Sequence, residues 1–161
     1  MASGDTLAVY TPQHGVPPAT LMALLGIRNI HPTLEFDAAT EWAIYFEDVL
    51  PRNYAGGGIT VNLHWLAATA TSGDVVWGAS VEAETTDLDA DSFGSEQTAT
   101  GTANGTSGIE TVTAIANTNG SQIDSLAAGG AFRLKVARKA AAGGDTMAGN
   151  AQLVKVELKE T

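Results

Sequence analysis

Apolar residues stand at every second position in two stretches near the middle of the chain. Polar side chains separate them in residues 59–65, and the alternation returns in residues 75–83 after a turn-rich connection. A period of two places successive side chains on opposite faces, so each stretch predicts a strand with one apolar face. Gly73 and Asp74 favour a hairpin turn between the two strands. Trp65 and Trp77 fall on the apolar faces, where we expect core packing.

Further stretches of strand character complete the predicted architecture. Residues 97–102 are expected to form an edge strand, and residues 109–116 are rich in β-branched side chains. The others, with alternating apolar positions, are residues 34–36, 42–46, 132–136 and 154–158. Turn residues separate these stretches, and no long helical pattern lies between them. We therefore predict an all-β fold, an antiparallel β-sandwich of about eight strands of the jelly-roll type. The Ala- and Gly-rich residues 140–150 are expected to be exposed and mobile.

Residues 1–30 differ from the rest, and we expect an extended N-terminal arm there, followed by a sandwich domain in residues 31–161. Residues 11–18 are rich in proline, which leaves little room for a helix. Residues 19–25 favour a short helical turn that Gly26 ends. The arm either packs back on its own domain or reaches a neighbouring subunit. Its candidate partner-binding residues are Tyr10, Pro17, Leu21, Leu24, Leu25 and Ile27.

Composition narrows the classes of partner. The 161 residues carry a formal net charge of −10, which disfavours nucleic acid and anionic membrane surfaces as partners. The chain has no cysteine, so neither disulfides nor thiolate metal sites can stabilise it. No apolar run approaches the roughly 18 residues of a membrane span. The N-terminus lacks the pattern of a signal peptide, so we expect synthesis in a cytoplasm.

Asp87, Asp89 and Asp91 form the stretch most similar to a metal loop. Carboxylates at alternate positions suit Ca²⁺, which prefers hard oxygen ligands. The match to an EF-hand loop is incomplete, because Ser92 replaces the glycine and Thr98 replaces the bidentate glutamate. Calcium and a solvated acidic loop are therefore both open alternatives.

Catalytic patterns are weak in this sequence. The three histidines are scattered, and no Gly-x-Ser-x-Gly motif is present. We therefore expect a protein that binds rather than an enzyme. Candidate stacking residues for a sugar are the three tryptophans with Tyr45 and Tyr54, although core packing is the better interpretation for Trp65 and Trp77.

One resemblance extends over residues 34–159. The sequence there resembles small β-sandwich proteins of tailed-bacteriophage particles. The residues that carry the resemblance are Phe36-Asp37, Trp42–Phe46, Leu50-Pro51, Tyr54, Gly57–Val61, Trp65 and Gly73–Trp77, and the closing strands fit the same pattern. The resemblance implies a virion structural protein, specifically a head decoration (cement) protein of the jelly-roll type. It further implies a homotrimer on the capsid surface, with the major capsid protein as its partner. The alternative is a carbohydrate-binding or tail-tip adhesion domain.

Overall fold

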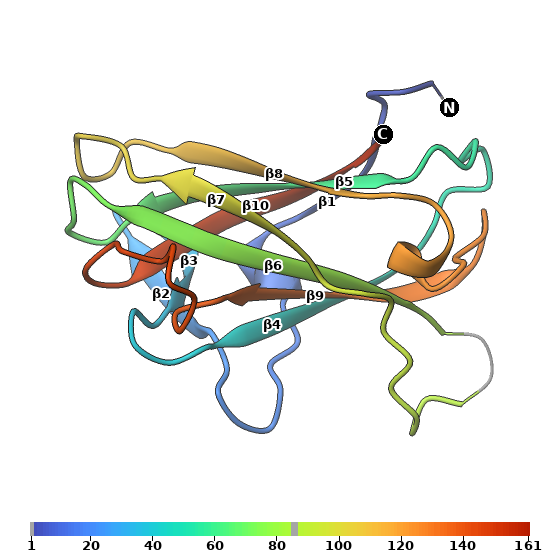
Figure 1. Cartoon of the computed structure of the whole chain (residues 1–161), viewed down its shortest axis with the longest axis horizontal. Helices are drawn as coiled ribbons and strands as arrows, with labels where there is room; N and C mark the ends of the chain where they lie inside the picture. Colours follow the sequence, from blue (N-terminus) through green and yellow to red (C-terminus); the bar gives the residue numbers. More distant parts are fainter. Residues whose placement is uncertain (1, 85–86) are drawn as a thin grey trace.

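Two antiparallel sheets pack face to face in the computed structural model, which describes residues 2–84 and 87–161 (Figure 1). The six-stranded sheet A has the order β2-β3-β10-β5-β8, with β1 also paired to β10, and the four-stranded sheet B has the order β4-β9-β6-β7. The strands are β1 (Thr6–Tyr10), β2 (Leu24–Arg28), β3 (His31–Phe36), β4 (Ala43–Val49), β5 (Ile59–Ala67), β6 (Asp74–Ala83), β7 (Gln97–Thr102), β8 (Thr111–Asn117), β9 (Ala131–Arg138) and β10 (Ala151–Glu160). Short 3-10 helices occur at η1 (Pro12–His14) and η2 (Ser121–Ile123). The predicted all-β jelly-roll sandwich is confirmed.

The core lies between the sheets and follows the predicted alternation. The apolar positions of residues 59–65 are all fully buried, and β7 lies at an edge of sheet B, as expected. Trp65 and Trp77 meet edge to face with their ring centroids 5.9 Å apart, and Phe36 packs on Trp77 in the same way at 4.9 Å. The indole N–H of Trp65 donates a hydrogen bond of 2.9 Å to Thr113 Oγ1. The aromatic cluster thus joins the two sheets.

The expected hairpin between β5 and β6 is wrong. β5 pairs with β10 and β8 in sheet A, whereas β6 pairs with β9 and β7 in sheet B. Residues 68–73 therefore cross from one sheet to the other, and the tryptophans meet across the core instead of along a shared sheet. Each apolar face packs against the opposite sheet, and local turn residues do not determine that choice.

The N-terminal segment is not a separate extended arm. β1 pairs with β10 and β2 pairs with β3, so both strands belong to sheet A. The helical turn expected in residues 19–25 does not form, because Leu24–Arg28 pairs with β3. Strand pairing satisfies backbone groups that a free arm would leave to water. The segment therefore packs back on its own domain, the first of the two predicted alternatives.

The loop between β1 and β2 covers an edge of sheet B. The N–H of Val16 donates to Tyr45 O at 2.8 Å, and the N–H of Tyr45 donates back to Val16 O at 3.0 Å. Ala23 N–H similarly donates to Ala43 O at 2.9 Å. These bonds occupy the outer edge of β4, which would otherwise be open to another strand.

A buried ion pair anchors the loop after β9. The side chains of Arg138 and Asp145 are 0% and 2% exposed, and two hydrogen bonds of 2.7 and 3.0 Å join them. Arg138 also donates to the carbonyl oxygens of Met147 and Gly149, each at 2.8 Å. Most of residues 140–150 are exposed as predicted, but Asp145 and the buried Met147 tie the loop to the core. None of the helices in the described parts of the chain is long and apolar enough to cross a membrane.

Candidate functional site

Large apolar side chains gather on the surface around β2 and the loop before it. Ile30 is 91% exposed, Ile27 79% and Leu25 64%. We define the N-terminal apolar surface as the exposed residues Val16, Pro17, Leu21, Leu24, Leu25, Ile27 and Ile30. Singly exposed apolar residues are ordinary, whereas a contiguous group marks an interaction surface.

The position of β2 explains why Leu25 and Ile27 are exposed. Residues paired across two strands lie on the same face of the sheet. Leu25 lies opposite the buried Leu34, and Ile27 lies opposite Pro32, so both side chains are on the inner face of sheet A. Among the described strands, sheet B ends at β4, and the edge beyond β4 is occupied by the β1–β2 loop. The inner face of β2 is consequently left uncovered.

A groove runs between β2 and the loop. It has a volume of about 300 Å³, and its lining includes Pro17, Met22, Leu25 and Ile44. Gly15 lies against the floor, where an added Cβ would come within 2.8 Å of Ile44 Cγ1. The groove therefore continues the apolar surface inward to the edge of the core.

The backbone is strained at two points of this surface. Asn29 and Ile30 form the turn between β2 and β3 with φ values of 46° and 68°, and Leu21 has a φ of 55°. Asparagine tolerates this left-handed region, but a β-branched residue is an outlier there. Such a residue costs roughly 1–3 kcal/mol. Isoleucine is thus kept exposed at a position where glycine would be more stable, and strain of this kind is frequent at functional sites.

The structure sorts the predicted partner-binding residues into two groups. Pro17, Leu21, Leu24, Leu25 and Ile27 are all exposed together on the N-terminal apolar surface. Tyr10 is instead buried, with its ring stacked on Phe46 at 5.1 Å and its hydroxyl donating to Asp48 Oδ2 at 3.2 Å. Burial, with the Asp48 carboxylate beside it, raises the pKa of Tyr10 above its ordinary value. Tyr10 is therefore a core residue, and its assignment as a contact residue is wrong.

Sequence reasoning missed Val16 and Ile30. Both lie outside any alternating pattern, which is why periodicity gave no reason to select them. For Val16 the available signal is charge, because residues 15–27 contain no Asp, Glu, Lys or Arg, whereas Ile30 follows Arg28 and lies outside this stretch. An uncharged stretch with many large apolar residues predicts either core or interface, and only the structure separates the two.

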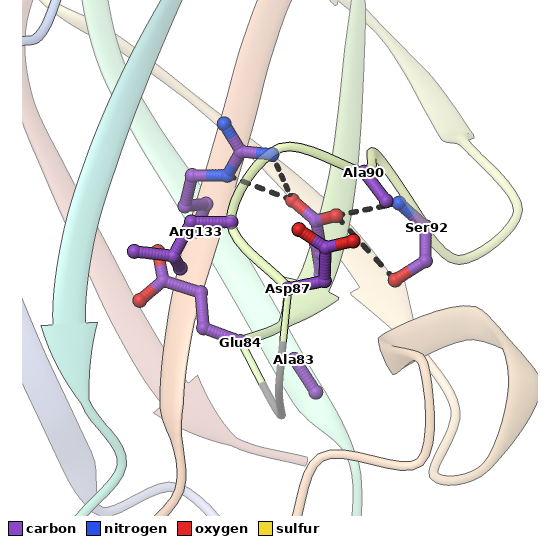
Figure 2. Close-up of a pocket in the computed structure, with 8 residues that line it drawn as sticks. Ala83, Glu84, Asp87, Ala90, Ser92 and Arg133 are labelled. Carbon is purple, nitrogen blue, oxygen red and sulfur yellow. Dashed lines mark hydrogen bonds and ion pairs between the residues drawn. The ribbon is translucent and has the colours of Figure 1, made fainter.

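A second, polar hollow lies over the far end of β6 and β9 (Figure 2). It has a volume of about 260 Å³ and is lined by charged side chains of the acidic loop and both strands. Arg133 Nε donates to Glu82 Oε2 at 2.7 Å, and Asp91 accepts a bond of 2.6 Å from the same guanidinium. The buried Glu82 also accepts from the backbone N–H of Ser92. Burial lowers the pKa of Arg133, but the bonds to Asp91 and Glu82 outweigh it and hold this pKa above its ordinary value. The ion pair between Glu82 and Arg133 joins neighbouring positions of β6 and β9.

The three predicted calcium ligands do not converge. Asp91 is bound to Arg133, whereas an Asp87 carboxylate oxygen accepts the backbone N–H of Asp89 at 3.0 Å. In the described ranges, no group of three or more acidic or histidine side chains is arranged to hold a metal ion. Asp87, Asp89 and Asp91 are therefore exposed on a loop that binds one arginine through Asp91, and the choice between a calcium loop and a solvated acidic loop stays a prediction.

The candidate stacking residues are also divided. Trp65 and Trp77 are fully buried, and Tyr54 is buried with its hydroxyl accepting from Gly58 N–H at 2.8 Å. Trp42 and Tyr45 are partly exposed on and beside β4. The Arg133 guanidinium lies over the Tyr45 ring at 6.0 Å and over the ring of Phe93 at 5.2 Å. The remaining planar surface is therefore small and partly occupied by that arginine.

Comparison with known proteins supports the fold. No family model matches the sequence, and no curated protein is significantly similar to it. The CBM22-1 xylan-binding domain from Paenibacillus barcinonensis Xyn10C is similar in structure, with 11% identity and a TM-score of 0.55 over 99% of this chain and 96% of that domain. A chain of infectious bursal disease virus Gx strain matches at 11% identity and a TM-score of 0.42, over 98% of this chain and 33% of its own length. The mannan-recognising module TmCBM27 matches at 9% identity and 0.44, over 99% and 100% of the two chains. At such identities the likeness to the xylan-binding domain shows a shared sandwich fold.

Proposed function

We propose that this chain is a virion structural protein, a head decoration protein that binds a phage capsid shell through the loop part of its N-terminal apolar surface, where Val16, Pro17 and Leu21 are exposed. It acts by contact rather than by catalysis, with the major capsid protein as its partner and the outside of the capsid as its location. Many copies, each making a modest interface, would together resist rupture of the shell. The homotrimer implied by the resemblance stays a prediction.

One observation carries this proposal. The chain has a formal net charge of −10, yet residues 15–27 are uncharged and expose Val16, Pro17, Leu21, Leu24, Leu25 and Ile27. Full burial of one such aliphatic side chain is worth about 1.5–3 kcal/mol. A surface with this much apolar area, on a chain otherwise well supplied with charge, supports docking onto another protein.

The loop part of this surface is the best placed for the shell. In Figure 1 the loop between β1 and β2 projects past β4, away from both chain termini. Pro17 and Leu21 are exposed in this loop. A projecting apolar loop can enter a depression on a partner without moving the sandwich behind it.

Leu21 provides a test in which stability and binding change in opposite directions. Its φ of 55° suits asparagine better than leucine, so Leu21→Asn should fold at least as well as the parent. We expect the parent chain to co-sediment with shells assembled from the capsid protein encoded in the same genome, at a saturating ratio. Leu21→Asn should weaken this binding by about tenfold, the equivalent of about 1.4 kcal/mol. Val112→Asn, at an exposed apolar position on β8, is the matched control and should bind like the parent. A parent chain that stays in the supernatant would refute the proposal.

Carbohydrate binding is the second candidate function. The likeness to a xylan-binding fold favours it, as does the partly exposed Trp42, which follows Glu41 in the sequence. Glu41 forms an ion pair of 2.8 Å with Lys139. An amphipathic ring next to polar groups is a common recognition arrangement. Titration with xylan and mannan oligosaccharides, followed by tryptophan fluorescence, tests it. Saturable binding that Trp42→Ala abolishes would favour this function over the first.

A further inference from the structure

β2 is an unprotected edge of sheet A. Among the described strands it pairs with β3 alone, and its other side carries no strand. Edge strands are usually protected from pairing with another chain by charged side chains, proline, a bulge or a covering loop. The sequence of β2 is Leu-Leu-Gly-Ile-Arg, and the register with β3 runs without a bulge. Its one charged residue, Arg28, turns away to bind Ala67 O at 2.9 Å and Gln152 Oε1 at 2.8 Å.

The turn determines which backbone groups face this free edge. Asn29 and Ile30 both have positive φ, as in a two-residue type I′ turn, so Arg28 and His31 form the closing hydrogen-bonded pair. Bonded and non-bonded pairs then alternate along the ladder. The pair of Ile27 with Pro32 is non-bonded, in agreement with the missing N–H of proline. The N–H and C=O groups of Leu25 and Ile27 consequently point outward.

We propose that the free edge of β2 pairs with the β2 edge of a second copy of this chain, antiparallel about a two-fold axis at Gly26. In this register Leu25 of each copy lies opposite Ile27 of the other, and each such pair exchanges its outward N–H and C=O bonds. Sheet A thereby continues through both copies. The exposed side chains of Leu25 and Ile27 from the two copies form one apolar cluster beside the two grooves.

The second copy is the occupant that this surface fits. An isologous contact requires a patch complementary to itself, and a strand whose outward residues are spaced equally about one glycine satisfies that requirement. Residues 24–27 carry no charge, and Arg28 is bonded to its own chain, so this edge offers nothing to attract a charged partner and adds no local repulsion between two copies of net charge −10. Gly26 at the axis has no side chain to block the close approach of the two backbones.

Native mass of the purified chain is the first test, and it is independent of any shell. We expect a mass of twice the 16.5 kDa of one chain, by light scattering across a dilution series. Ile27→Lys should give the monomer, because a lysine on an edge strand opposes strand addition. Val112→Lys is the control, since Val112 is 50% exposed at the opposite edge of the same sheet, and it should stay dimeric. The dimer and the homotrimer implied by the resemblance exclude each other, so a trimer of the parent chain overturns this proposal in favour of that prediction. A monomer overturns it too, and so does a control variant as disruptive as Ile27→Lys.

A cysteine at the axis tests the register even if Ile27→Lys fails to fold. The chain has no cysteine, so Gly26→Cys introduces a unique thiol. Residues facing each other in a non-bonded antiparallel pair have Cα atoms about 4.5 Å apart, within the range for a disulfide of about 4.4–6.8 Å. A Cβ at Gly26 lies 3.0 Å from both Glu35 Oε1 and Thr33 Oγ1, so these two side chains must shift by a few tenths of an ångström to accept the cysteine. Mild oxidation should convert Gly26→Cys to a covalent dimer while Val112→Cys stays reduced. Equal cross-linking of the two variants, or none in either, overturns the two-fold pairing.

Discussion

Replacing Asp145 by asparagine should destabilise the fold strongly, although the change is isosteric. Arg138 is 0% exposed, and Asp145 is the carboxylate that balances its charge through two hydrogen bonds. Asparagine leaves the guanidinium with carbonyl partners at Met147 and Gly149 but no counter-charge. Breaking a buried pair in this way costs about 3–5 kcal/mol. That is a large part of the roughly 5–15 kcal/mol that stabilises a typical domain.

The loss is measurable by calorimetry and by urea unfolding. For a chain of this length each kcal/mol lowers Tm by about 2–4 °C, so a drop of roughly 6–20 °C is expected. Asp89→Asn, at an exposed carboxylate, removes the same charge and should change stability by about 0.5 kcal/mol or less. The double variant Arg138→Met with Asp145→Leu should recover part of the loss, because it leaves no buried charge. If Asp145→Asn unfolded at the same temperature as Asp89→Asn, the account of this ion pair would be refuted.

Three further predictions follow from single contacts. Ile30→Gly creates an Asn-Gly turn and relieves the strain at a φ of 68°, so the unfolding free energy should rise by about 1 kcal/mol in urea titrations, and an unchanged or lower value would contradict the strain. Thr113→Val removes the acceptor of the Trp65 indole N–H and should cost about 1–3 kcal/mol, whereas Thr113→Ser should cost less because it keeps the hydroxyl. Backbone N–H bonds from residues 39 and 40 lower the pKa of Asp37, so its contribution to stability is present above the unfolded pKa of about 3.9 and is lost as pH falls through the folded value. Asp37→Asn should therefore lose less stability than the parent on acidification, and identical pH profiles would count against this contribution.

The strands were predictable because alternation is local information. The alternation within residues 59–65 already indicates which side chains face the core, and those side chains are buried in the structure. The partner of each strand was not predictable, since β5 lies beside β10, which is more than eighty residues away in sequence. A β-bulge between Thr6 and Ala8 further obscured β1, because it breaks the alternation that would have placed Tyr10 in the core.

The site was predictable in part for a similar reason. The exposed contact residues lie in a stretch whose lack of charge can be read directly from the sequence. Their exposure results from where sheet B ends, which is a tertiary property. For Arg138, by contrast, the sequence itself indicates the tertiary contact. It falls on the apolar parity of Phe132, Leu134 and Val136, and a charged residue at that position indicates a buried partner nearby. Asp145 was the nearest acidic residue to consider.

β10 is the last of the described strands along the chain, yet it lies in the interior of sheet A between β5 on one side and β1 and β3 on the other. During synthesis β3 and β5 therefore emerge before the strand that joins them, and their edges toward β10 stay open until residues 151–160 have emerged. Sheet A cannot close before that point, and the chain must avoid aggregation while its sandwich is incomplete. A truncation that removed β10 would therefore take away the middle of this sheet, not one of its edges.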